Sequence, residues 1–441
     1  MHRILSLVSC VAIPWLGLST AQTAVPSDLP PEVLLLSKIK SRASEDLNRL
    51  QSCTCLLTLE RSTLNTPRKP FKHIDTVEAE VADINGHEMY AWPGTNHFGI
   101  TSLAQLIGTG LAGTGTFSSL AQNLFLADAA TFRYAGSESL SGTPTARYDF
   151  RLPSLSSGHR MSTTGGSAVI GLSGALWADP ESFHLLRLQI IGQDIPASLG
   201  VRSTETDIDY TLTNIADGLT LVMPARATEI VVYQGGTANR NRIEFTHCHR
   251  TAGTGGPPAA SSLDIDTPPD ELTLPSGLVC VTRLQTAIDS QRTRVGDPIS
   301  ASVIHDVVKN RNVVIPAGAV LAGRVRMLQK DGPDYVVGLE FDQIRFAGKE
   351  ARFIAVLERL DRRPGVELAQ SRKLNANEQI IVPRDPPRGV TQITEVERHQ
   401  TIVPTQLPGV ATFFVERAAR FKIDPGLKME WWTVPLRSAL Q

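Results

Sequence analysis

Short runs of strand-forming residues follow one another through most of the chain, and turn residues separate them. Asn85-Gly86, Asp217-Gly218 and the turn at 179–182 stand between such runs, with no helical pattern in between. Strands that succeed one another in this way pair with their sequence neighbours in a meandering antiparallel sheet. The sequence therefore predicts a mainly β fold, with strands near residues 55–61, 76–84, 146–152, 168–178, 184–192, 206–213 and 227–233.

One helix is predicted before the first strand, over residues 31–50. Leu36, Ile39 and Leu47 recur there at helical spacing, while lysine, arginine and glutamate occupy the other sides. An amphipathic helix of this kind needs an apolar surface to cover, and the neighbouring sheet can provide it.

A second set of strands begins at Leu278, after a segment with a different composition. Residues 251–277 are rich in Gly, Pro, Ser and Ala, which predicts an extended linker behind a first domain at 31–250. Residues 278–437 have the bends and glycines of a small β-barrel or sandwich, including Gly323 where strands approach closely. Residues 361–405 are dense in Arg, Pro and Gln, and we expect a loop insertion there.

The N-terminus has the pattern of a secretory signal peptide over residues 1–21. A basic start precedes an apolar run at 4–18 and small residues that fit cleavage after Ala21. A membrane anchor is the alternative, but the run is shorter than the roughly 20 residues of a spanning helix and contains Pro14. Lipidation at Cys10 is a second, weaker alternative. We expect a periplasmic or secreted protein with no transmembrane helix after cleavage.

Charge and cysteine content narrow the partners and the covalent framework. Lys and Arg total 43 against 44 for Asp and Glu, so no basic field attracts nucleic acid, and we expect no nucleic-acid partner. Signal cleavage leaves Cys53, Cys55, Cys248 and Cys280, an even number that suggests disulfides in an exported chain. Cys53 and Cys55 lie near the limit of what one bond can bridge, which favours long-range partners.

The stretch LIGTGLAGTGTF at 106–117 contains Gly108, Gly110 and Gly113 in the G-x-G-x-x-G spacing of dinucleotide sites. Such a site needs a βαβ unit around it, and none is indicated here. We therefore predict no nucleotide and no other cofactor. The glycines are interpreted as a mobile loop between two short helical pieces.

No metal site and no catalytic group stand out. In a strand Cys248 points away from His247 and His249, so the three cannot share an ion; a disulfide cysteine between exposed histidines is favoured. Neither H-E-x-x-H nor G-x-S-x-G occurs, although paired carboxylates that meet only in space stay open. Trp92 and Trp177 are expected to pack in the sheet core.

Two motifs, MYAWPG at 89–94 and GALWADPESFHLLRLQI at 174–190, make residues 31–250 resemble lipoprotein carriers of the LolA and RseB type. The resemblance implies an antiparallel half-barrel covered by a few helices. It is nearest to exported bacterial proteins with one cysteine before a T-x-E-R strand and another near the domain's end. Those positions correspond to Cys55 and Cys248 and imply a disulfide; Cys53 departs from the pattern, with Cys280 as its candidate partner.

Carriers of this type bind acyl chains beneath their helices, so the resemblance implies that the helix 31–50 and the segment 102–127 are lids. The motif at 294–299 makes the second domain similar to small β-barrel domains of envelope proteins, which is an expectation about fold alone. The expected cavity and lid residues are Leu36, Ile39, Leu47, Leu106, Gly108, Gly110, Gly113, Trp92 and Trp177.

Two functions are weighed. A non-catalytic envelope protein that binds a lipid, a lipoprotein or a protein segment predicts a continuous apolar cavity under the helix 31–50. An extracellular hydrolase of polysaccharides or esters predicts acids, or Ser with His and Asp, in a polar cleft. A structural adaptor that binds only another envelope protein is the third possibility.

Overall fold

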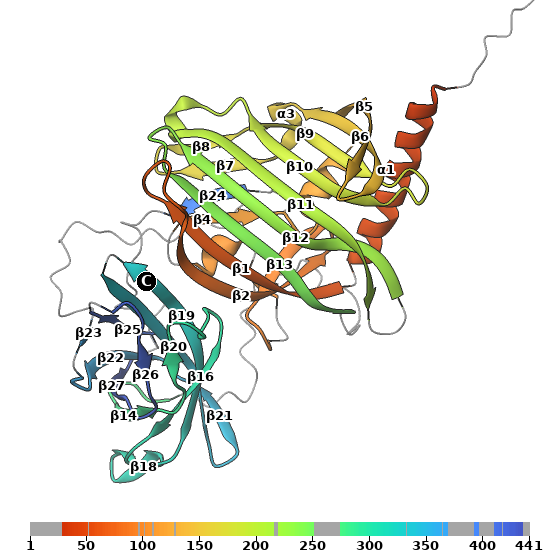
Figure 1. The fold of residues 1–441 in the computed structure, drawn as a ribbon. Coiled ribbons are helices and arrows are strands. Elements are labelled where there is room, and N and C mark those ends of the chain that lie inside the picture. The colour runs from red at the N-terminus through yellow and green to blue at the C-terminus, as the bar shows by residue number, and fades with distance from the viewer. Residues whose placement is uncertain are drawn as a thin grey trace, which may run out of the picture.

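The protein is represented by a computed structural model, and its strands dominate the fold (Figure 1). The predicted signal peptide and most of the predicted linker lie outside the described residues. The structure describes residues 29–51, 53–95, 98–100, 102–107, 110–127, 129–215, 219–250, 274–331, 333–363, 365–368, 392–396, 410–416 and 418–434.

The first half forms a ten-stranded antiparallel sheet in the order β3-β2-β1-β13-β12-β11-β10-β9-β6-β5. Most neighbours in this order are also neighbours along the chain, which confirms the predicted meander. The strands are β1 (Cys53–Leu64), β2 (Lys72–Ile84), β3 (His87–Ala91), β5 (Thr131–Leu140), β6 (Thr143–Leu152), β9 (Gly171–Ala178), β10 (Leu185–Gln193), β11 (Val201–Ile215), β12 (Leu219–Tyr233) and β13 (Ala238–Arg250).

Side chains of this sheet alternate between an apolar face and a charged face. On β1, Leu57 and Leu59 are buried in the core while Glu60 faces the other way. Across the charged face Arg187 lies 2.7 Å from Asp209, and similar ion pairs link neighbouring strands. One face of a single-layer sheet must be covered, and the opposite face can be solvated.

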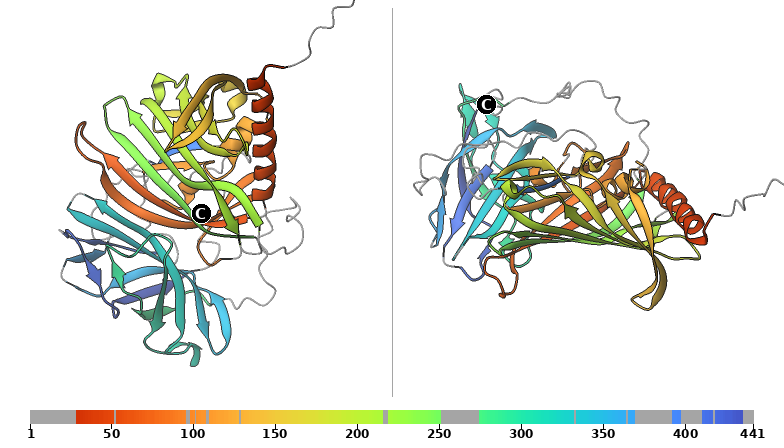
Figure 2. Two further views of the ribbon diagram at one scale, coloured as in Figure 1. Left: turned by 45° about the vertical axis from the view of Figure 1, so that its right-hand side comes forward. Right: turned by 90° about the horizontal axis from the view of Figure 1, so that it is seen from above.

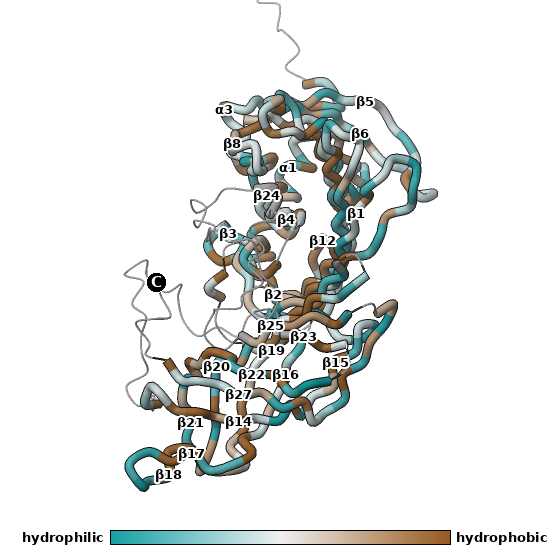
Figure 3. The backbone as a smooth tube through the Cα atoms, turned by 90° about the vertical axis from the view of Figure 1, so that its left-hand side faces the viewer, coloured by the Kyte–Doolittle hydropathy of each residue, from teal (hydrophilic) through white to brown (hydrophobic). Residues whose placement is uncertain are grey.

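The covered face is the concave side of the curved sheet (Figure 2), so the half-barrel implied by the resemblance is confirmed. Seen nearly edge-on, α1, β4 and β24 all lie on one side of the sheet (Figure 3). The elements outside the ten-stranded sheet in this half are α1 (Pro31–Leu50), η1 (Leu103–Gln105), β4 (Gly110–Thr114), α2 (Ser119–Phe125), α3 (Ser154–Ser157), β7 (Arg160–Thr163), β8 (Gly166–Val169) and η2 (Ala197–Leu199).

The second half forms a nine-stranded antiparallel sheet in which β22-β27-β14-β16-β19-β20-β25-β23 are in order and β21 pairs with β20. Trp431 is fully buried between Phe341 and Phe353, at centroid distances of 5.8 and 5.7 Å. The strands are β14 (Val279–Leu284), β16 (Pro298–Val303), β19 (Val320–Asp331), β20 (Asp334–Phe346), β21 (Lys349–Arg352), β22 (Ala355–Leu360), β23 (Val366–Leu368), β25 (Val410–Val415) and β27 (Lys428–Thr433), with short pairs of β15 (Ile288–Asp289) with β26 (Lys422–Ile423) and of β17 (Val307–Lys309) with β18 (Asn312–Ile315).

Two segments predicted as loops contain strands. The segment 361–405 includes β23 and also β24 (Gln392–Val396), which pairs antiparallel with β4 and parallel with β7 in the first half. The glycine stretch likewise forms β4, so the predicted loop is wrong for Gly110–Thr114. Both errors have one cause: each strand is stabilised by a partner far away in the sequence, which local composition does not reveal.

The two sheets meet along the free edge of β2. Val77 and Val295 form a parallel bridge, in which the Glu78 amide donates to Val295 at 2.8 Å and the Val295 amide donates to Thr76 at 3.0 Å. Gly296 fits here because a Cβ would lie 2.5 Å from the Glu78 carbonyl oxygen. The motif at 294–299 therefore docks the second half onto the first.

Candidate functional site: the capped concave face

Helix α1 covers the concave face because one side of it is apolar. Its buried residues Ile39, Ala43, Asp46, Leu47 and Leu50 recur every three or four positions and so form one stripe. The helix packs against β12 and α2. Asp46 is the exception in this stripe, since it places a carboxylate among apolar neighbours.

Polar contacts hold α1 at its outer margin. The Tyr148 hydroxyl of β6 donates to the Glu32 carbonyl at 2.6 Å. His184 Nδ1, just before β10, lies 3.1 Å from Asp46 Oδ2 and 3.3 Å from Arg42 Nε. These side chains tie two turns of the helix to the sheet.

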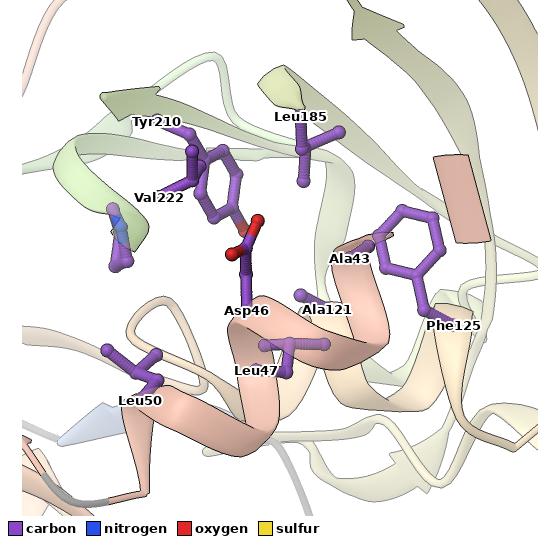
Figure 4. A pocket seen from close by; sticks show the side chains of 10 residues that line it. Ala43, Asp46, Leu47, Leu50, Ala121, Phe125, Leu185, Tyr210 and Val222 are labelled. Carbon is purple, nitrogen blue, oxygen red and sulfur yellow. The ribbon is translucent and has the colours of Figure 1, made fainter. Parts of the chain in front are cut away.

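A small pocket, here called the capped pocket, remains beneath α1 (Figure 4). Its volume is about 20 Å³, which is room for about one water molecule. The continuous apolar cavity expected under this helix is therefore absent from the described residues, because side chains of α1, α2 and the sheet fill the space. The lining residues are Ala43, Asp46, Leu47, Leu50, Ala121, Phe125, Leu185, Tyr210, Val222 and Pro224.

Two polar atoms in the capped pocket lack hydrogen-bond partners among the described residues. They are Oδ1 of Asp46 and the hydroxyl of Tyr210, which point toward each other across the pocket in Figure 4. Burial raises the pKa of Tyr210 far above its usual value, and the nearby charge of Glu88 raises it further. Buried polar atoms without partners cost about 1–3 kcal/mol each.

A second buried carboxyl, Glu88, lies near the capped pocket, close enough for its charge to act on Tyr210. Glu88 of β3 accepts a hydrogen bond from the Phe117 amide at 2.9 Å through Oε1. Desolvation raises the pKa of Glu88 to about 7, and the charge of Asp83 adds to the shift. Asp83 accepts from Gln122 of α2 at 2.5 Å.

Strand β4 covers a third carboxyl, Glu229 of β12. Asn241 of β13 donates to Glu229 Oε2 at 3.0 Å and to the Leu111 carbonyl at 3.2 Å, and burial raises the pKa of Glu229 to about 7. A Cβ at Gly113 would lie 1.8 Å from Glu229 Oε1. Gly113 is thus required for close packing of the strand on the carboxyl.

The predicted cavity residues do not all gather at one place. Ile39, Leu47 and Leu106 are buried in the core that α1 covers, and Leu36 packs against it half-buried. Gly110 and Gly113 lie in β4, and Gly108 lies outside the described residues.

Both tryptophans lie away from α1. Trp92 is at the contact between the two sheets, with the guanidinium groups of Arg324 and Arg326 5.4 and 4.7 Å from its ring. Trp177 alternates with the core residue Leu176 and so faces the opposite side of the sheet, where Arg147 lies 5.2 Å from its ring. Trp177 is nevertheless buried, at 7 % exposure, and its indole donates to Glu138, so it packs in the sheet but does not line the capped pocket.

The cysteines are partly as expected. Cys55 and Cys248 form a disulfide that joins β1 to β13, and His247 and His249 on either side of it are exposed. Cys53 and Cys280 are both buried and are not disulfide-bonded, so the expected bond between them is absent.

The arrangement expected of a hydrolase is not found in the described parts of the chain. Glu88 and Glu229 have the raised pKa of catalytic acids, but both side chains are at most 5 % exposed and the cap elements cover them.

No group of three His, Cys, Asp or Glu side chains among the described residues could hold a metal ion. None of the described helices has the length and apolar character that crossing a membrane requires.

Sequence reasoning missed Asp46, Glu88, Tyr210 and Glu229. A usable signal exists for Asp46, which falls in the apolar phase of the helix, three positions after Ala43. Glu229 likewise falls in an apolar phase, between Ala227 and Val231 of β12, while Arg226 and Thr228 occupy the other phase.

Several solved structures are similar to this chain. A DUF1329 family protein from Desulfovibrio piger is 10% identical with a TM-score of 0.30, over 52% of this chain and 96% of its own. A LolA superfamily protein from Nitrosomonas europaea is 10% identical with a TM-score of 0.23, over 47% and 92%. The lipoprotein LppX from Mycobacterium tuberculosis is 12% identical with a TM-score of 0.19, over 49% and 97%. No protein-family model and no curated protein matches the chain. The fold assignment rests on the sheet order and helix positions described above.

Proposed function

We propose that this protein is a non-catalytic, exported carrier that takes up an apolar ligand, the acyl chain of a lipid or lipoprotein, between α1 and the concave face of the first sheet. The observation that carries the proposal is the capped pocket, which α1 closes at the cost of burying Asp46 and Tyr210 atoms without partners. Polar atoms in this position weaken the apolar packing that holds the helix closed. Lifting α1 hydrates them and exposes an apolar surface.

The way α1 is attached supports a hinged cap. Its polar tethers, at Tyr148 of β6 and at His184 just before β10, both join it to the sheet. At its other end the chain enters β1, which the Cys55–Cys248 disulfide joins to β13. The helix can therefore swing from its C-terminal end once the tethers break, while the sheet stays intact.

Export is part of the same proposal. The N-terminal pattern of a signal peptide supports it, and a disulfide of long sequence separation fits an oxidising compartment. Both the periplasm and the exterior of the cell meet this condition.

The test is binding of cis-parinaric acid, a fluorescent fatty acid, to the chain from residue 22 onward. Wild type should raise its fluorescence in a saturable way. His184→Ala removes a tether worth about 1 kcal/mol, so a larger open fraction should tighten the apparent affinity about fivefold. His305→Ala, at an exposed histidine of the second half, is the matched control and should leave the affinity unchanged.

Lipid extraction provides an independent readout. Protein purified from a bacterial periplasm should carry acyl chains that native mass spectrometry detects and that organic solvent removes. If neither wild type nor His184→Ala binds the fatty acid, and the purified protein carries no lipid, the carrier function is refuted.

A further inference from the structure

A cleft separate from the capped pocket opens between the two sheets. We call it the interface cleft; it has a volume of about 370 Å³, within the range of about 300–1,000 Å³ that small-molecule sites occupy. One wall is the start of β2, and the other comes from the turn after β15 and from β19 and β20. The lining residues are His73, Ile74, Asp75, Thr76, Ser290, Gln291, Arg292, Thr293, Arg294, Leu328, Lys330, Tyr335 and Ala419.

The acidic groups at this cleft are already neutralised. Asp75 is buried and forms a two-point ion pair with Arg61, at 2.7 and 2.5 Å, and it also accepts from Gln329 at 3.2 Å. Glu78 pairs with Arg294 across the contact between the sheets. These carboxylates therefore have little charge left to offer a cation in the cleft.

The remaining charge of the cleft is positive. Arg292 and Lys330 form no ion pair with any carboxylate of the described residues, and His73 lines the same cleft. Unpaired arginine and lysine side chains that line one concave site attract an anion strongly, because low-dielectric walls focus their field.

Lys330 is held in place before any ligand arrives. Its Nζ donates to the Ala418 carbonyl at 3.0 Å and lies 4.8 Å from the centroid of the Tyr335 ring. That ring in turn packs edge-on against Phe421 at 5.0 Å. An ammonium group fixed in this way loses little side-chain entropy on binding an anion.

The backbone that carries Arg292 is fixed as well. Its amide and that of Thr293 donate to the Asp289 carbonyl at 3.1 and 2.8 Å, and Asp289 lies in β15. Val295, three residues later, forms backbone hydrogen bonds with Thr76 and Glu78 of β2. Arg292 therefore lines the cleft from a turn whose backbone is held in a defined position.

We propose that the interface cleft binds a phosphate group, carried by a small solute or by a lipid headgroup. Arginine and lysine supply the charge-assisted hydrogen bonds that phosphate accepts, and the surrounding walls supply serine and threonine. Because the walls belong to both sheets, the bound phosphate bridges them and stabilises their contact. This inference stands on residues that the proposed carrier function does not use.

The test is calorimetric titration of the chain from residue 22 onward with inorganic phosphate and with glycerol 3-phosphate. Arg292→Ala/Lys330→Ala should weaken binding tenfold or more, since both charge-assisted hydrogen bonds to the phosphate are lost. The matched control is Arg283→Ala/Lys428→Ala, an exposed arginine and lysine that face each other on β14 and β27. It should bind as wild type does.

Vesicles distinguish the two sources of phosphate. Binding to phosphatidylglycerol but not phosphatidylcholine vesicles, lost in Arg292→Ala/Lys330→Ala, assigns a lipid headgroup; binding of the soluble phosphates alone assigns a small solute. Equal binding by both double variants, or no binding of any phosphate compound, overturns the proposal. The parinaric acid assay reports on the capped pocket and the phosphate titration on the interface cleft. Failure of one proposal can therefore be told from failure of the other.

Discussion

Replacing Glu229 with glutamine should stabilise the protein at pH 8 and leave its stability nearly unchanged at pH 4.5. Burial raises the folded-state pKa of Glu229 to about 7, from 4.5 as the ordinary value. A carboxyl with a raised pKa binds its proton more tightly in the folded state, so its stabilising contribution is complete below pH 4.5 and is lost as the pH rises through 7. A shift of this size corresponds to about 3 kcal/mol.

Glutamine is neutral at every pH and keeps an oxygen that can accept from Asn241, so the variant should avoid this loss. The assay is urea unfolding at pH 4.5 and 8, followed by tryptophan fluorescence. The expected gain of Glu229→Gln over wild type is about 3 kcal/mol at pH 8. Glu244→Gln, at an exposed glutamate of β13, is the control. A difference between Glu229→Gln and wild type that is the same at both pH values would refute the reasoning.

Three other predictions concern stability. Reducing Cys55–Cys248 should lower the free energy of unfolding by up to about 5 kcal/mol, since the bond spans 193 residues; Tm with and without reductant checks this, and an unchanged Tm contradicts it. Gly113→Ala should cost about 1–3 kcal/mol, and less in a Glu229→Ala background, because its Cβ would overlap that carboxyl; a double-mutant cycle in urea without coupling would contradict the packing. Burial lowers the pKa of His159 to about 4, so wild type should lose about 3 kcal/mol as the pH falls from 6.5 to 4, while His159→Gln keeps its stability over that range.

Helix α1 and the meander could be predicted because their signals are local. The apolar spacing of Ile39, Ala43 and Leu47 defines the helix, and Pro31 at its first position marks its start, as observed. Successive hairpins bring sequence neighbours such as β9, β10 and β11 together without any distant partner. The resemblance to known carriers added the disulfide pairing, which composition alone left open.

The capped pocket could be predicted only in part. Ile39 and Leu47 were placed correctly on the inner side of α1, but Tyr210 is 164 positions away from Asp46 in sequence, and nothing local relates the two. The side of the sheet on which Trp177 lies could not be predicted either. In an apolar run such as GALWA both strand faces read alike, so the face that a tryptophan takes depends on pairing register.

The sequence by itself determined the class of the fold, the amphipathic helix and the export signal as an expectation, since each depends on residues a few positions apart. The tertiary structure decided the rest. Curvature of the sheet placed Glu88 and Glu229 under cap elements, and burial, a property of the whole fold, raised their pKa values. The tertiary structure also brought β24 beside β4 and placed Arg292 and His73 at the same cleft, because long-range packing governs which distant segments meet.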